Sequence, residues 1–296
     1  MSNKLFLTGS TGFVGKNLID NFSKIFEINS YKRNSEIIIN ENIVIHLAGI
    51  AHDTKNTLFP EIYYKINTEF TKKIFDAFLN SDAKVFITLS SVKAISDKLN
   101  GVLTEESKAN PFTHYGNSKL LAEQYILSKE IPNGKRVYIL RPCMIHGPGN
   151  KGNLNLLFKL ISYGIPWPLG AFENKRSFCS IENLMFIFRE LIERDDILSG
   201  VYNVADDLPL STNELVLLLA ESQNIRTKIC ILPKDFIRFT AKVGNFFKLP
   251  FNEEQLKKLT DTYIVSNKKL LDAIGKSLPI SSTDGLLKTF NSFKNS

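Results

Sequence analysis

The fold is decided near the start of the sequence by the stretch Lys4-Leu5-Phe6-Leu7-Thr8-Gly9-Ser10-Thr11-Gly12-Phe13-Val14-Gly15. Its first part is a short apolar run that ends at a glycine, which is typical of a buried strand in a parallel sheet. From Gly12 to about Phe22, apolar side chains recur at the spacing of one helix face. The stretch therefore predicts a strand over Lys4–Thr8, a tight turn and a helix.

The glycines of this turn have the spacing of a phosphate-binding turn. Gly9 permits the tight turn itself, Gly12 lets the backbone approach a pyrophosphate, and Gly15 lets the helix pack closely on the strand. The N–H groups and the positive dipole at the start of the helix favour phosphate oxygens. The residues that we expect at this dinucleotide site are Gly9, Thr11, Gly12, Phe13, Val14 and Gly15.

Strands and helices alternate along the rest of the chain. Further strands are expected over 25–31, 42–47, 84–90, 136–141 and 201–204, and helices over 68–79, 115–128, 180–193 and 211–222. The last of these helices should begin with a capping box formed by Ser211 and Glu214. This alternation predicts an α/β fold with a doubly wound parallel sheet. Glycine and proline become frequent after Pro142, which places a soft domain boundary near residues 148–152.

Composition limits the classes of protein to which the chain can belong. Its 296 residues, 43% of them apolar, can bury a sizeable core, so disorder as the main state is excluded. Lysine and arginine number 37 against 30 acidic residues, and this net charge of +7 favours anionic small molecules over nucleic acid. The three cysteines and four histidines show no metal or disulfide spacing, and His46 is interpreted as a packing residue. Without a visible secretion signal or membrane span, we expect a cytoplasmic protein.

The end of the second expected strand bears on the choice of cofactor. It reads Ser30-Tyr31-Lys32-Arg33, where NAD-binding folds place an acidic residue for the ribose. Lys32 and Arg33 would instead pair with a 2′-phosphate, which favours NADP, with NAD as the alternative. In that alternative both cations are solvated, and Glu27 or another acid binds the ribose. The segment 34–41 is too short for the usual helix, so the adenine contacts are left open.

A tyrosine and a lysine stand four residues apart in Tyr115-Gly116-Asn117-Ser118-Lys119, and so share one helix face. An ammonium group in that position can lower the pKa of the phenol. The phenol can then exchange a proton with a hydroxyl or ketone. Ser90 and Ser91 follow a parallel strand, at the edge where open α/β sheets bind ligands. We therefore expect Ser91, Tyr115 and Lys119 to be the catalytic residues.

In these features the chain resembles the extended short-chain dehydrogenase/reductase family, and within it the NAD(P)-dependent nucleotide-sugar epimerases, reductases and dehydratases. The matching motifs cover almost the whole chain and are Thr8–Gly15, His46–Gly49, Asn67, Leu89–Ser91, Tyr115–Lys119, Arg141–Gly149 and Arg176–Leu184. The resemblance implies a Rossmann-like cofactor domain over residues 1–150, to which 177–205 returns. Residues 151–296 would mainly form a smaller substrate domain.

The resemblance also implies roles for single residues. Tyr115 would be the acid and base, Lys119 would bind the nicotinamide ribose and the tyrosine, and Ser91 would hold the reacting oxygen. The further cofactor contacts would be Leu47, Ala48, Gly49 and Asn67. The residues implied for the nucleotide diphosphate of the substrate are Asn153, Leu154 and Arg176.

The nearer resemblance is to bacterial enzymes of surface-polysaccharide synthesis. Some of them reduce a UDP-linked 4-keto-6-deoxy-N-acetylhexosamine, and others epimerise carbon 4 of a UDP-sugar with tightly bound NAD. Met144 and Ile95-Ser96 depart from the pattern of the galactose epimerases, which favours the reductase. Outside the enzymes, the alternative is a regulatory protein that only senses the dinucleotide. The family also implies a homodimer that pairs through the helices over 68–79 and 115–128.

Overall fold

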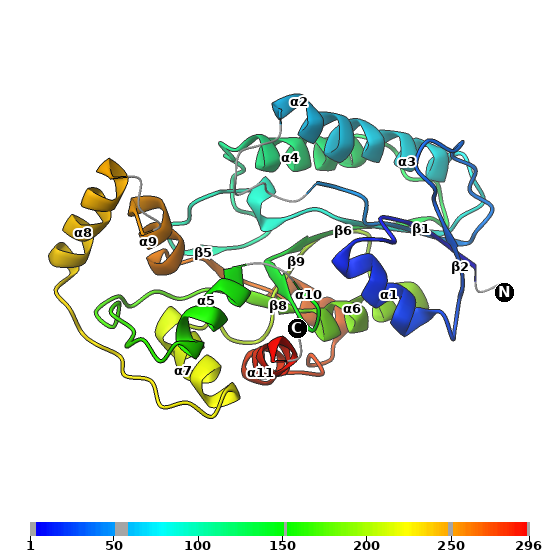
Figure 1. Ribbon diagram of the computed structural model, residues 1–296. Helices are drawn as coiled ribbons and strands as arrows, with labels where there is room; N and C mark the ends of the chain where they lie inside the picture. Colours follow the sequence, from blue (N-terminus) through cyan, green and yellow to red (C-terminus); the bar gives the residue numbers. More distant parts are fainter. Residues whose placement is uncertain (1–3, 51–58, 151–152, 248–250, 295–296) are drawn as a thin grey trace.

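The computed structural model describes residues 4–50, 59–150, 153–247 and 251–294, and its centre is a parallel sheet of six strands (Figure 1). In spatial order the strands are β2 (Glu27–Ser30), β1 (Lys4–Thr8), β3 (Ile43–His46), β4 (Val85–Leu89), β6 (Arg136–Pro142) and β9 (Gly200–Val204). Each one coincides with a predicted strand, and only β6 and β9 extend a residue beyond the predicted range. The doubly wound α/β fold is confirmed.

Helices cover both faces of this sheet. The covering helices are α1 (Phe13–Phe22), α3 (Phe70–Leu79), α4 (His114–Leu127) and α6 (Ile181–Glu193). Leu5 and Leu7 of β1 pack in one core with α1 and α6, whereas Phe6 between them packs in a second core with α3 and α4. Because both faces are buried, the inner strands β1, β3, β4 and β6 have apolar residues at successive positions, which is why the sequence predicts them well. The edge strand β2 is only partly buried.

The helix expected over 68–79 begins earlier than the sequence predicts. Residues Pro60–Tyr63 form α2, and Tyr64–Glu69 form a π-helical turn, η1, that runs on into α3. The prediction was wrong because two residues that η1 turns inward, Asn67 and Thr68, are polar and so do not show as an apolar stripe. Thr68 Oγ1 donates to the Ser118 carbonyl of α4 at 2.8 Å. Such π-turns interrupt helices mostly at functional sites.

Helices from the second half of the chain build a separate core. They are α5 (Asn153–Ser162), α7 (Thr212–Ser222), α8 (Lys234–Phe246), α9 (Glu253–Thr260) and α11 (Ser282–Phe293). The single tryptophan, Trp167, is buried in this core, and its indole N–H donates to Asn213 at 2.9 Å. Ser211 and Glu214 form the predicted capping box of α7. None of the helices in the described part of the chain is long and apolar enough to cross a membrane.

Short elements connect the two halves of the chain. They are η2 (Val92–Ala94), β5 (Val102–Leu103), β7 (Met144–His146), β8 (Phe178–Ser180), β10 (Ile264–Val265) and α10 (Lys268–Ile274). β7 pairs with β8 and β5 pairs with β10, so segments distant in sequence lie side by side. The sequence predicts none of these two- and three-residue strands, since a period of two cannot be recognised over so few residues.

The order of the strands reverses at β1. Strand β2 pairs with one side of β1 and β3 pairs with the other, and the segment 31–42 between them contains no helix. In open α/β sheets, a crevice that binds ligands lies beyond the carboxyl ends of the strands at such a reversal. The glycine turn after Thr8 and the segment after His46 both leave the sheet at this edge.

A buried ion pair fastens α4 to the sheet. Arg141 of β6 donates to the Glu123 carboxylate of α4 through Nε at 3.0 Å and Nη2 at 2.5 Å. Both side chains are buried, and charges removed from water in this way are stable only when they remain paired. The pair therefore holds in place the helix that carries Tyr115 and Lys119.

Arg141→Met should lower the free energy of unfolding by about 3–5 kcal/mol, because Glu123 would stay buried without its counter-charge. Urea unfolding measures the change. The control is Lys288→Met, which removes a surface pair with Glu182 at 2.8 Å and should cost less than about 1 kcal/mol. Equal losses in the two variants would contradict the role given to the buried pair.

Candidate active site

The glycine turn and the segment after β3 are in direct backbone contact. Gly9 has a φ of +75°, and a Cβ on it would lie 2.6 Å from the Leu47 carbonyl carbon and from the Ala48 nitrogen. The Ala48 N–H donates to Thr8 Oγ1 at 3.1 Å. Only glycine fits at position 9, in conformation and in space. The structure thus brings Leu47 and Ala48 against the turn with which the sequence analysis grouped them.

Gly12 and Gly15 differ in their surroundings. A Cβ on Gly15 would overlap the Gly9 carbonyl oxygen, so this glycine lets α1 pack closely on the turn that follows β1. A Cβ on Gly12 would meet only that oxygen within 4 Å, at 3.3 Å. Packing among the described residues therefore does not require glycine at position 12, whereas the close approach of a ligand would. Thr11, beside it, is exposed.

His46, the last residue of β3, links the glycine turn to α3. Its Nδ1 lies 2.7 Å from Thr8 Oγ1, and its Nε2 lies 2.9 Å from Thr71 Oγ1. The Thr71 hydroxyl donates to the Asn67 carbonyl at 2.8 Å, so it accepts from His46 and the ring proton sits on Nε2. Burial, helped by the charge of Lys119, lowers the pKa of His46 to about 3. His46 is a neutral, doubly hydrogen-bonded linker, a role that goes beyond the packing expected from the sequence.

Asn67 holds the segment after Gly49 from inside the protein. Its Oδ1 accepts from the Ile50 N–H at 2.8 Å, and its Nδ2 donates to the Ile50 carbonyl at 3.1 Å and to Ser118 Oγ at 3.0 Å. A Cβ on Gly49 would lie 3.0 Å from both Asn67 Oδ1 and Lys119 Nζ. Asn67 is completely buried and positions the backbone of this segment, and its contact with the cofactor stays a prediction.

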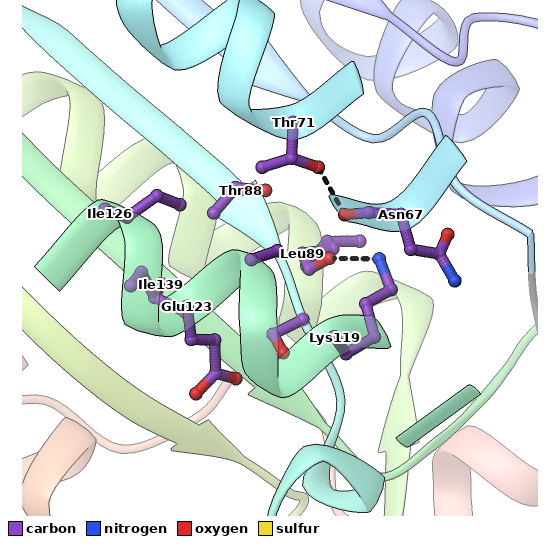
Figure 2. Close-up of a pocket in the computed structure, with 10 residues that line it drawn as sticks. Asn67, Thr71, Thr88, Leu89, Lys119, Glu123, Ile126 and Ile139 are labelled. Atoms are coloured by element: carbon purple, nitrogen blue, oxygen red, sulfur yellow. Dashed lines mark hydrogen bonds between the residues drawn. The ribbon is translucent and has the colours of Figure 1, made fainter. Parts of the chain in front are cut away.

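Lys119 reaches from α4 to the carboxyl end of β4, where Figure 2 shows it beside Asn67. Its Nζ donates to the Leu89 carbonyl at 2.9 Å. Burial lowers the pKa of Lys119 to about 8, and the negative charge of Glu123 opposes the shift. An ammonium group has three N–H bonds, and the described residues accept one of them from Lys119, which leaves two for a ribose hydroxyl or a phenol oxygen.

The structure brings Ser91 and Tyr115 together. The Ser91 side chain lies close enough to the phenol to affect its pKa, and Ser91 Oγ accepts from the Lys93 N–H at 3.2 Å as it caps η2. Burial raises the pKa of Tyr115, the Ser91 side chain opposes the rise, and Lys119 is not among the groups that shift it. The expected lowering of this pKa by Lys119 is therefore wrong for this structure. The Tyr115 phenol is protonated at neutral pH.

Lys32 and Arg33 follow β2 at the carboxyl edge of the sheet, and both are exposed. Glu27, the alternative ligand for the ribose, is the first residue of β2 and lies at the opposite edge, 3.5 Å from Lys4. Glu41 is buried and already accepts two hydrogen bonds. Neither acid is both near the carboxyl edge and unpaired, so the two cations remain the better-placed groups for a ribose phosphate.

Arg176 lies where the second core meets the sheet. Its backbone pairs with Leu210 and Tyr263, and its Nε donates to the Asp261 carbonyl at 2.9 Å. Burial lowers the pKa of Arg176, although the charge of Asp261 opposes the shift. Leu154 buries its side chain in the second core, so only its backbone could face a substrate. Asn153 begins α5, and its side chain lies outside the described residues.

Two residues near Ser91 were missed by the sequence analysis. The Tyr263 hydroxyl donates to the Ser96 carbonyl at 2.6 Å, which ties a distant segment to the region after η2. Lys93 Nζ lies 4.1 Å from the centre of the Tyr263 ring. Burial is the main cause that lowers the pKa of Lys93 to about 8, and the charge of Arg176 adds to it. The only signal for Lys93 in the sequence is its place two residues after Ser91.

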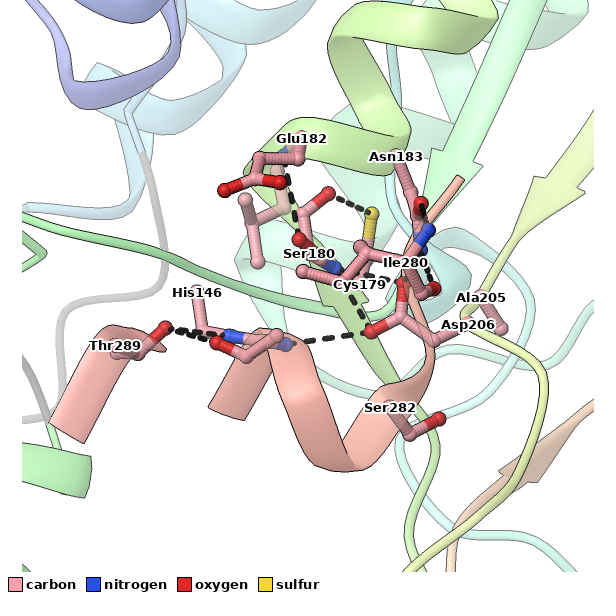
Figure 3. Close-up of polar contacts among 12 residues, drawn as sticks. His146, Cys179, Ser180, Glu182, Asn183, Ala205, Asp206, Ile280, Ser282 and Thr289 are labelled. Carbon is pink, nitrogen blue, oxygen red and sulfur yellow. Dashed lines mark hydrogen bonds and ion pairs between the residues drawn. The ribbon is translucent and has the colours of Figure 1, made fainter. Parts of the chain in front are cut away.

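A buried polar network lies where β7 and β8 meet α11 (Figure 3). The Asp206 carboxylate accepts from the Ser180 N–H at 2.9 Å and from Asn183 at 2.7 Å, and His146 Nε2 lies 3.3 Å from it. On the other side, His146 Nδ1 lies 2.9 Å from Thr289 Oγ1 of α11. The network fixes the last helix against the pair of short strands. Within the described ranges, no three His, Cys, Asp or Glu side chains are grouped to hold a metal ion.

The profile of the NAD dependent epimerase/dehydratase family matches residues 34–205, more than half of the sequence. The chain belongs to this family. The match confirms the resemblance to extended short-chain dehydrogenases/reductases, and with it that the protein is an enzyme of this type that binds NAD(P).

Relatives and solved structures of this family extend over nearly the whole chain. A Vibrio cholerae protein named UDP-glucose 4-epimerase is 29% identical over 99% of this chain and 96% of its own. An Escherichia coli O157:H7 protein named N-acetyl-alpha-D-glucosaminyl-diphospho-ditrans,octacis-undecaprenol 4-epimerase is 27% identical over 79% of this chain and 76% of its own. The structure of UDP-glucuronic acid 4-epimerase from Bacillus cereus in complex with NAD has a TM-score of 0.76 at 17% identity, covering 99% of both chains. The structure of RMD from Pseudomonas aeruginosa complexed with NADPH has a TM-score of 0.73 at 21% identity, covering 99% of this chain and 100% of that one.

Alanine at positions 12 and 15 should separate the two uses of glycine in the turn. Gly15→Ala should lower the free energy of unfolding by at least about 2 kcal/mol, since backbone must move to admit the Cβ. Gly12→Ala should stay within about 1 kcal/mol of the wild type, yet bind the dinucleotide at least about tenfold more weakly. Urea unfolding and calorimetric titration measure the two effects. Wild-type affinity in Gly12→Ala would show that no phosphate lies at this turn.

Proposed function

We propose that the protein is an NAD(P)-dependent oxidoreductase that acts at carbon 4 of a nucleotide sugar. The approach of the Ser91 side chain to the Tyr115 phenol carries this proposal, since it places a second hydroxyl beside an acid. Lys119 Nζ is bound to the Leu89 carbonyl at the carboxyl end of β4, the strand that Ser91 follows. Open sheets of this kind bind their ligands along that edge. Membership of the epimerase/dehydratase family supports the same reading.

We propose that residues 1–150, together with 177–205, hold the cofactor, and that most of 151–296 holds the substrate. The glycine turn and the segment Leu47–Gly49 would surround the pyrophosphate. Lys119 would bind the nicotinamide ribose. Arg176 would bind a phosphate of the nucleotide, with Asn153 and Leu154 beside it.

When bound, the nicotinamide supplies or accepts a hydride at carbon 4 of the sugar. Tyr115 would exchange a proton with the oxygen on that carbon, and the Ser91 hydroxyl would hold the same oxygen. Because burial raises the pKa of Tyr115, the phenol begins protonated and suits proton donation to a 4-keto group. The ammonium form of Lys119 would then stabilise the phenolate that is left.

Within this class we favour the reduction of a UDP-linked 4-keto-6-deoxy-N-acetylhexosamine in surface-polysaccharide synthesis. The protonated Tyr115 suits reduction of a ketone, and the exposed cations Lys32 and Arg33 suit an exchangeable NADP. The second candidate is a UDP-sugar 4-epimerase with tightly bound NAD, which the name of the Vibrio cholerae relative favours. The Escherichia coli relative is also named a 4-epimerase, but of a sugar joined through a diphosphate to undecaprenol. An epimerase would use the same groups in both directions, so the two candidates differ in cofactor exchange rather than in site geometry.

We also propose a homodimer that pairs through α3 and α4. The two helices lie side by side on one face of the sheet (Figure 1), and Leu121 and Leu127 of α4 are exposed. A second copy would cover these side chains. Light scattering at micromolar concentration should give the mass of a dimer, and a monomer would contradict this proposal.

Tyr115→Phe should lower the turnover rate by about 10²–10⁴-fold, because it removes the proton donor. Steady-state rates with a panel of UDP-, dTDP- and GDP-linked 4-keto sugars measure the effect. Tyr125→Phe is the matched control. It removes another phenol of α4, whose hydroxyl donates to Asp76. The control should keep the wild-type rate. A loss of less than about tenfold in Tyr115→Phe would exclude it as the acid.

NADPH should bind at least about tenfold more tightly than NADH, because one charge-assisted contact to the 2′-phosphate is worth about 1.5–3 kcal/mol. Calorimetric titration at fixed ionic strength measures the ratio, since salt screens such contacts. Arg33→Asp should narrow or reverse the preference for NADPH over NADH. Lys24→Asp changes an exposed cation that precedes β2, at the other edge of the sheet, and should leave it unchanged. Equal affinities, or tighter NADH, would favour the epimerase with bound NAD.

A further inference from the structure

Helix α8 contacts the rest of the protein through one face only. Ile237, Ala241 and Gly244 are its buried residues, and their spacing places them in one row along the helix. Ile237 and Ala241 join the second core. Gly244 lies so close to the Phe251 carbonyl that a Cβ would overlap it. The opposite side of α8 is therefore left without packing partners among the described residues.

That opposite side carries a row of exposed aromatic rings. Phe236 is 55% exposed, Phe239 is 64%, Phe246 is 81%, and Phe247, just after the helix, is 65% exposed. Phe239 and Phe246 are seven residues apart and so lie above one another on the helix. Phe246 and Phe247 contact each other, with ring centres 5.0 Å apart. A cluster of exposed phenylalanines on one helix is costly in water and indicates a surface that is covered in use.

A row of cations runs beside the aromatic row. Lys234, Arg238 and Lys242 follow one another at intervals of four residues, and all are exposed. The one acid of the helix, Asp235, lies 3.2 Å from Arg238 and cancels a single charge. At 100° per residue, the cationic row borders the aromatic row on one side, and the buried row lies opposite the aromatics. The outward surface of α8 is thus divided lengthwise into a positive strip and an apolar strip.

We propose that α8 docks on the surface of an anionic lipid bilayer. Such a surface offers negative headgroups beside an acyl region, and a helix that lies in its plane matches them with cations beside aromatic side chains. A second copy of this chain fits less well, because two α8 faces in contact would bring six cations together. In Figure 1, α8 (yellow-orange) stands at the outer edge of the molecule, away from the six-stranded sheet, so a flat surface can reach it.

The full-length protein is tested by co-sedimentation with two kinds of vesicle, one of phosphatidylcholine alone and one that also contains phosphatidylglycerol. We expect binding to the anionic vesicles only, weaker at higher salt. The double variant Phe239→Ser/Phe246→Ser should lose at least about tenfold in binding. Lys234→Gln/Lys242→Gln should bind the anionic vesicles at least about tenfold more weakly, since each charge contributes roughly fivefold to the affinity.

The control is Tyr163→Ser/Leu198→Ser, which removes two comparably exposed apolar side chains elsewhere and should bind like the wild type. Urea unfolding checks that each variant is folded. If the phenylalanine variant does not fold, the lysine double variant and the salt series still test the proposal. Three results would overturn it. The first is equal binding to both kinds of vesicle, and the second is wild-type binding by the phenylalanine variant. The third is a wild-type dimer that the phenylalanine variant converts to monomers, since this would show that a second copy covers α8.

Discussion

The close approach of Gly9 to the backbone of Leu47 and Ala48 is the constraint on which the rest of the structure depends. Two neighbouring parallel strands end there, and their following segments must leave the sheet without colliding. A residue with a positive φ and no side chain makes this possible where a Cβ would lie 2.6 Å from backbone atoms. The same contact builds one wall of the crevice at which the strand order reverses. Any larger residue would push Leu47–Gly49 away from the turn, and with it the backbone beside Lys119.

The polar groups around this contact divide into groups that hold the backbone and groups available for chemistry. His46 and Asn67 are completely enclosed, with ring and amide bonded to protein atoms, which buried polar groups need to be stable. Tyr115 and Ser91 lie close to each other, and Lys119 makes one hydrogen bond, to the Leu89 carbonyl, among the described residues. Burial raises the pKa of Tyr115 and lowers that of Lys119 to about 8, so one fold brings the acidities of a phenol and an ammonium group out of their usual order.

The sheet and the glycine turn could be predicted from the sequence because both are local patterns. Strand β3, buried on both faces, opens with three consecutive apolar residues, Ile43–Ile45, and the capping box at Ser211 needs residues only three apart. The place of Asn67 could not be predicted, since its π-helical turn depends on Ser118, far along the chain. The pKa of Tyr115 follows from burial by the whole fold. That the phenylalanines of α8 face outward could not be predicted either, because apolar residues at helical spacing normally face a core.

The central claim is that a hydride passes between carbon 4 of a nucleotide sugar and the nicotinamide beside Tyr115. A nucleotide sugar deuterated at carbon 4, incubated with the protein and oxidised cofactor, tests it when the nicotinamide is analysed by mass spectrometry after denaturation. For a reductase run in reverse we predict deuterium in the reduced nicotinamide, and for an epimerase we predict that the cofactor returns the deuterium to carbon 4 of the product. Conversion of the sugar with loss of the deuterium to water would contradict the claim.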